Sequence, residues 1–95
     1  MRKYYLIAYD ISDPKRLRQV YRTMRGYGDP LQYSVFICNL SGKEKVLMLT
    51  HLEDIINHVE DRIMVVDLGN SDEECERIEF FGRQSSLPER QAVIV

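Results

Sequence analysis

The run from Tyr4 to Tyr9 constrains the fold of this chain more than any other segment. All six of its residues are apolar or aromatic, which is typical of a strand buried from both sides in the middle of a sheet. The run ends at Asp10, and it is far shorter than the roughly 20 apolar residues that span a bilayer or than a signal-peptide core. We therefore expect a globular, cytoplasmic protein with no membrane partner, built around this strand.

A helix with one strongly basic face is predicted after this strand. Asp13 is a candidate N-cap, and Pro14 suits the first helical position. Apolar residues then recur at helical spacing, at Leu17, Val20, Tyr21 and Met24. The remaining positions carry the basic residues Lys15, Arg16, Arg18, Arg22 and Arg25.

Charge is distributed unevenly along the chain, although its net charge is only −2. Residues 1–28 carry a net of +5, and residues 44–79 carry a net of −8. If the two segments lie on different faces, a polyanion can bind the basic one through Arg16, Arg18 and Arg22. Alternatively, these arginines only solvate the helix or pair with acidic residues of the 44–79 segment.

Further strands and a second helix follow in alternation. Residues Leu31–Leu40 are rich in β-branched and aromatic types and predict one strand, either straight or bent. Ser41 and Glu44 have the spacing of a capping box, and the apolar stripe behind them predicts a helix to about residue 59. Short strands are expected at Ile63–Leu68, Glu79–Phe81 and Ala92–Val95, with loops at Asn70–Glu76 and Gln84–Arg90. The β-α-β-α-β-β-β order predicts a single domain over residues 1–95, an α/β fold of the α+β sandwich type with helices on one face of the sheet.

The last four residues, Ala92–Val95, are apolar. An undocked terminus is normally polar and frayed, so this segment is expected to be covered. It could pair with a sheet edge of its own chain or of a second copy, which makes a dimer plausible.

Asp10 is the first candidate for chemistry, because strand ends and the loops after them are where open sheets build their sites. One or two carboxylates, completed by waters and substrate phosphate, commonly hold Mg²⁺, and a twofold axis would supply a second Asp10. Alternatively, Asp10 with Ser12 and Asp13 satisfies backbone N–H groups of the turn. Nucleophile motifs are absent from the sequence, and Cys38 and Cys75 support neither a zinc site nor a disulfide framework.

Four aromatic residues have two interpretations. They can pack in the core or an interface, or, beside arginines, line a nucleic-acid groove. They are Tyr5, Tyr9, Tyr33 and Phe36.

Three segments, in this order and spacing, resemble the CRISPR-associated protein two family. They are Tyr9–Ser12 at the end of the first strand, Lys15–Val20 in the basic helix and Gln32–Phe36 in the next strand. The likeness covers the whole chain, including Leu68-Gly69 and Glu79–Gly82.

This resemblance implies a ferredoxin-like fold in which Leu31–Leu40 is a broken or paired strand. It implies a symmetric homodimer whose C-terminal strand, residues 91–95, packs on the partner's sheet. It further implies a metal-dependent endonuclease acting on RNA or DNA, in which Asp10 of both subunits is catalytic and binds one shared Mg²⁺.

The resemblance also implies a place in the adaptation stage of CRISPR immunity, as a dimer that bridges integrase subunits and holds a DNA fragment. A non-catalytic scaffold of this kind needs the basic helix and the dimer, whereas a nuclease needs the carboxylates as well. A small-molecule-sensing dimer of the same fold is a further alternative, but it would not need a helix with five basic residues.

Overall fold

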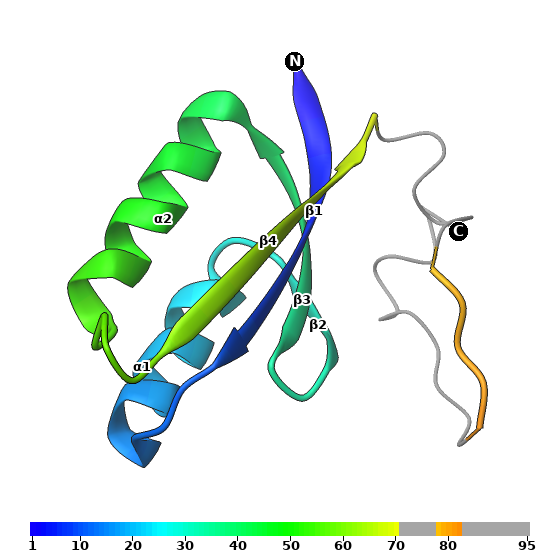
Figure 1. Ribbon diagram of the computed structural model, residues 1–95. Coiled ribbons are helices and arrows are strands. Elements are labelled where there is room, and N and C mark those ends of the chain that lie inside the picture. Colours follow the sequence, from blue (N-terminus) through cyan, green and yellow to red (C-terminus); the bar gives the residue numbers. More distant parts are fainter. Residues whose placement is uncertain (71–77, 83–95) are drawn as a thin grey trace.

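Four antiparallel strands and two helices form the protein in the computed structural model, which describes residues 1–70 and 78–82. The sheet order is β2-β3-β1-β4, and both helices lie against one of its faces (Figure 1). The βαββαβ chain order with these neighbours is the ferredoxin-like fold that the family resemblance implied, and it differs from the β-α-β-α-β-β-β order expected from the residue pattern. The elements are β1 (Arg2–Asp10), α1 (Pro14–Arg25), β2 (Asp29–Gln32), β3 (Val35–Ser41), α2 (Gly42–Ile55) and β4 (Arg62–Gly69).

Strand β1 lies in the middle of the sheet, as its two-sided apolar run predicted. Leu6 is paired with Ile37 of β3 on one side and with Val66 of β4 on the other. Because side chains alternate along a strand, Tyr5, Ile7 and Tyr9 all face the helices.

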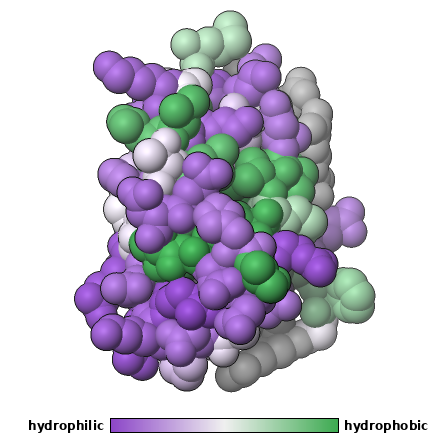
Figure 2. Space-filling view, turned by 60° about the vertical axis from the view of Figure 1, so that its left-hand side comes forward, coloured by the Kyte–Doolittle hydropathy of each residue, from purple (hydrophilic) through white to green (hydrophobic). Residues whose placement is uncertain are grey.

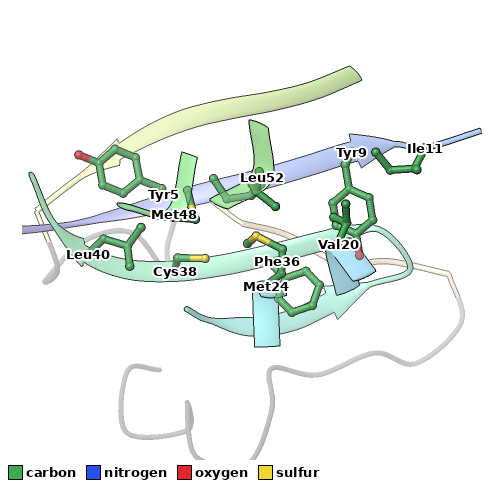
Figure 3. Close-up of a cluster of buried hydrophobic side chains, with 11 residues drawn as sticks. Tyr5, Tyr9, Ile11, Val20, Met24, Phe36, Cys38, Leu40, Met48 and Leu52 are labelled. Carbon is green, nitrogen blue, oxygen red and sulfur yellow. The ribbon is translucent and has the colours of Figure 1, made fainter. Parts of the chain in front are cut away.

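The core fills the space between the helices and the helix-facing side of the sheet (Figure 3). Each helix contributes a pair of residues four positions apart, which places both side chains on one face. The largest of the fully buried side chains in this core are Phe36, Ile7, Met24, Met48, Leu52 and Val20.

The opposite face of the sheet, here called the open face, is also apolar. By the same alternation it carries Leu6, Ala8 and Ile37 from the two inner strands. Met64 and Val66 of β4 are on this side and remain 53% and 37% exposed. No described helix covers this face (Figure 1).

Both helices begin where local capping signals predicted. The Asp13 carboxylate accepts a hydrogen bond from the Arg16 N–H at 2.9 Å, with proline in the first turn of α1. At α2, the Ser41 hydroxyl accepts from the Glu44 N–H at 3.1 Å, and the Glu44 carboxylate accepts from the Ser41 N–H at 2.8 Å. This is the reciprocal capping box.

The single strand expected at Leu31–Leu40 is wrong, because the segment folds into the β2–β3 hairpin. Gln32 is paired with Val35, so the turn consists of Tyr33 and Ser34. Ser34 has a φ of 65°, a left-handed conformation that lets the chain reverse. Glycine or asparagine usually marks such turns, and neither is present at these two positions.

Helix α2 ends at Ile55, not near residue 59 as predicted. Asn57 Oδ1 accepts hydrogen bonds from the N–H groups of Val59 and Glu60, at 2.9 and 3.0 Å. This side-chain turn competes with further helix. Val59, at the predicted end of the helix, is 93% exposed.

Of the strands and loops predicted for the C-terminal quarter of the chain, one strand lies within the described residues and can be compared with the structure. Glu79–Phe81 is not a strand, because a strand requires pairing and no described strand is hydrogen-bonded to this segment. The predicted strand Ala92–Val95 and the loop Gln84–Arg90 lie outside the described residues, as does nearly all of the loop Asn70–Glu76. Among the described helices, none has the length and hydropathy of a membrane span.

Candidate nucleic-acid and metal site

Asp10 lies at the rim of the open face, as the exposed last residue of β1. Its partner across the sheet is Arg62 of β4, and directly opposite residues project to the same side. The two residues line a shallow hollow of about 200 Å³ together with Ala8, Tyr9 and Met64.

The Asp10 carboxylate makes no hydrogen bond or ion pair with any other described residue. The alternative that Asp10, Ser12 and Asp13 satisfy the following turn is confirmed for Asp13, which accepts from the Arg16 N–H, but not for Asp10, since the Ser12 N–H is bound by Asp61. Its oxygens are therefore available to a cation. Within residues 1–70 and 78–82, three or more metal-binding side chains do not cluster anywhere. One chain supplies one free carboxylate at this position.

A buried ionic network holds the loop that follows Asp10. The side chain of Asp61, just before β4, is fully buried and accepts a hydrogen bond from Arg16 Nε at 2.8 Å. It also accepts from the N–H groups of Ser12 and Asn57, at 3.0 and 2.8 Å. Charge-assisted hydrogen bonds of this kind are shorter and stronger than neutral ones. Asp61 thus ties the loop after β1, the start of α1 and the turn before β4 together.

The sequence contained a signal for this network but did not single out Asp61. The segment 44–79 holds eleven acidic residues, and nothing in their spacing says which one meets the basic helix. Only the fold brings Asp61 within reach of a residue 45 positions earlier in the chain.

Arg16 and the amide donors hold the pKa of Asp61 well below its usual range. A carboxyl group whose pKa is lowered on folding stabilises the folded state above its ordinary pKa of about 4, and this contribution is lost as the pH falls further.

We expect Asp61→Asn to lower the free energy of unfolding at pH 7, and the difference from the unsubstituted protein to shrink steadily below pH 4. Urea unfolding at pH 7, 4 and 2.5 measures this. Glu53→Gln, at an exposed position of α2, is the control, and a deficit that does not change with pH would contradict the role of Asp61.

The three predicted phosphate contacts differ in their surroundings. Arg16 is engaged by Asp61 and by Glu60 Oε1 at 3.2 Å, which is the pairing with the acidic segment considered above. Arg18 and Arg22 are exposed and form no ion pair with a described residue. They are four positions apart on α1, so their guanidinium groups share one side of the helix.

Comparison with known proteins identifies the family. Residues 1–75 match the family model described as "CRISPR associated protein Cas2". The chain belongs to the Cas2 family. This confirms the resemblance drawn from the three sequence segments.

Two relatives of this Cas2-family chain match over nearly its whole length. A protein of Rhodospirillum rubrum named "CRISPR-associated endoribonuclease Cas2 1" is 43% identical over 96% of this chain and 89% of its own length. A protein of Geobacter sulfurreducens named "CRISPR-associated endoribonuclease Cas2" is 36% identical over 100% of both chains. The solved structure of Streptococcus pyogenes Cas2 superimposes with a TM-score of 0.76 at 33% identity, covering 83% of this chain and 99% of that one.

Proposed function

We propose that this protein is a nucleic-acid-binding homodimer that cleaves phosphodiester bonds of RNA or DNA in the cytoplasm with the help of Mg²⁺. The observation that carries the proposal is the free carboxylate of Asp10 at the rim of an apolar, helix-free sheet face. The relatives named endoribonucleases support the same activity.

The open face supports the dimer. Met64 and Val66 leave apolar surface exposed on it, and each Å² of apolar surface removed from water contributes about 25 cal/mol. Two copies related by a twofold axis through this face would bring their Asp10 residues toward one another. We also propose that residues 1–95 form one domain whose segment 91–95 docks as a strand on the partner's sheet.

The residues at this rim suit a shared Mg²⁺. Two carboxylates, one Asp10 from each copy, leave positions for waters and substrate oxygens, which is the way Mg²⁺ is commonly held. When bound, the ion polarises the scissile phosphodiester and lowers the pKa of a bound water. Asp10 is the proposed catalytic residue and metal ligand. The Ser12–Asp61 contacts keep the adjoining loop in place, and so fix the position of Asp10.

The basic face of α1 is proposed to bind the phosphate backbone. Arg18 and Arg22 are the accessible contacts, and Arg16, held by Asp61, presents the rest of its guanidinium at 23% side-chain exposure. Binding nucleic acid through this face requires no metal. A dimer that holds DNA for integrase subunits in the adaptation stage is therefore the second proposed role, and it rests on the basic helix and the dimer.

Metal removal separates the two roles. We expect purified protein to cut end-labelled RNA or DNA in Mg²⁺, to stop when EDTA is added, and to resume when excess Mg²⁺ is restored. Binding measured in EDTA should persist, because the arginines and not the ion supply it. If the protein binds nucleic acid but cleaves neither single nor double strands, the proposed nuclease role is ruled out and the scaffold role remains.

A further inference from the structure

A groove between α1 and the β2–β3 turn has aromatic lining residues that none of the proposed roles uses. Its volume is about 480 Å³, within the range of roughly 300–1,000 Å³ of small-molecule sites. Six residues line it, Tyr9, Leu17, Arg18, Tyr21, Arg22 and Tyr33. Apolar patches between hydrophilic side chains are visible on the side of the molecule that faces the viewer in Figure 2.

Helix α1 supplies one wall of the groove. Leu17 and Tyr21 are four positions apart, and so are Arg18 and Arg22, so the two pairs run side by side along the helix. Tyr21 is further fixed by Arg25, whose Nη1 donates to the Tyr21 hydroxyl at 3.2 Å. The wall is therefore an aromatic and aliphatic strip bordered by two guanidinium groups.

The opposite wall is Tyr33, at the tip of the β2–β3 turn. Its neighbour Ser34 adopts a φ of 65°, and the Ser34 carbonyl accepts a hydrogen bond from the Tyr9 N–H at 3.0 Å. This bond anchors the turn to the end of β1. The backbone at Tyr33 is thus held beside the end of β1, and the residue is 83% exposed. A large exposed aromatic on an anchored turn is a ready stacking surface.

The floor of the groove is aromatic and rigid. The rings of Tyr9 and Tyr21 lie 6.2 and 5.5 Å from that of Phe36, which is fully buried. Burial, with Tyr21 and Tyr33 close by, raises the pKa of Tyr9 to about 12. The floor therefore presents a neutral phenol, and among the described residues of the lining the only charged ones are the two arginines.

We infer that this groove binds one unpaired nucleotide of a nucleic-acid strand, its base against Tyr33 and Tyr21 and its phosphates on Arg18 and Arg22. Aromatic walls suit the face of a base, and two cations, with no acidic residue among the described lining residues, suit a phosphate. A base inside a duplex has both faces covered by its neighbours, so it cannot enter without leaving the stack.

The inference rests on the proposed function, because it takes the ligand to be nucleic acid. It adds to that function the place where one nucleotide binds. Tyr9 lines both this groove and the hollow of Asp10. The groove opens on the helix side of the sheet and Asp10 lies on the open face, so the end of β1 stands between a nucleotide seated here and the proposed cleavage site.

Binding of a fluorescent ten-nucleotide single strand and of a blunt duplex, in EDTA so that nothing is cleaved, tests the groove. Stacking contributes about 1–3 kcal/mol per base, so Tyr33→Ala is expected to weaken single-strand binding roughly 5- to 100-fold. Duplex binding should be unchanged. Tyr33→Trp keeps an aromatic face and should retain single-strand binding. Arg18→Ala should weaken both ligands and flatten the dependence of binding on salt.

Lys43→Ala is the matched charge control, because it removes one positive charge from an exposed position in the first turn of α2. It should leave the preference for single strands unchanged. The inference is overturned if Tyr33→Ala binds the single strand as the unsubstituted protein does, or loses both ligands equally. It is also overturned if a free mononucleotide competes as well as the ten-nucleotide strand. Because no step needs cleavage, failure of the nuclease leaves this test intact.

Discussion

Replacing Asp10 with asparagine is expected to lower Mg²⁺-dependent cleavage by at least about a hundredfold. Stabilisation of the transition-state charge by a bound metal is worth several kcal/mol, and each 1.36 kcal/mol is a factor of ten in rate. The amide keeps the size of the side chain but removes its charge. Because a dimer carries every substitution twice, the shared position would lose both carboxylates.

The substitution should leave the fold and the dimer intact, since the Asp10 side chain is exposed and makes no contact that the described structure depends on. Circular dichroism and sedimentation measure this. Asp54→Asn, an exposed carboxylate on α2, is the matched control and should cut at the ordinary rate. Equal cleavage by Asp10→Asn and unsubstituted protein, both freed of contaminating nuclease, would end the proposed role of Asp10.

Placing a charge on the open face is expected to separate the dimer. Val66 lies opposite Leu6 in the sheet and is 37% exposed in the single chain. Two copies stacked on this face would bury an aspartate at this position, and a buried, unpaired charge costs several kcal/mol. The twofold axis applies this cost twice, so the dissociation constant should rise by a thousandfold or more in Val66→Asp.

Sedimentation over a dilution series measures this change. Val46→Asp makes the same replacement at a position of α2 that is 62% exposed. It lies on the helical side of the molecule and should leave the dimer unchanged. If Val66→Asp dimerises like Val46→Asp, the open face is not the interface.

Elements with local signals could be predicted from the sequence. The starts of α1 and α2 follow from Asp13 and from Ser41 with Glu44, whose hydrogen bonds span only three residues. The hairpin could not be predicted, because its turn residues, Tyr33 and Ser34, have side chains typical of a strand or a loop. The end of α2 was missed because the apolar spacing continues past Ile55, while the Asn57 turn ends the helix.

The residues of the candidate site also differ in whether the local sequence could reveal them. Asp10 could be singled out from its position at the end of an apolar strand, which is a property of the local sequence. Asp61 and the groove could not, because each exists only where distant segments meet: Arg16 with Asp61, and α1 with the turn at Tyr33. Charge patterning indicated that basic and acidic segments matter, but it could not say that Arg16 is paired while Arg18 and Arg22 form no ion pair with a residue that the structure describes.

Counting bound ions per chain tests the central claim most directly. Mn²⁺ prefers the same oxygen ligands as Mg²⁺, and electron paramagnetic resonance distinguishes free from bound Mn²⁺. We predict one bound ion per two chains in the unsubstituted protein and none at this position in Asp10→Asn. One ion for every chain, or binding that survives in Asp10→Asn, would contradict a metal shared by two Asp10 carboxylates across a twofold axis.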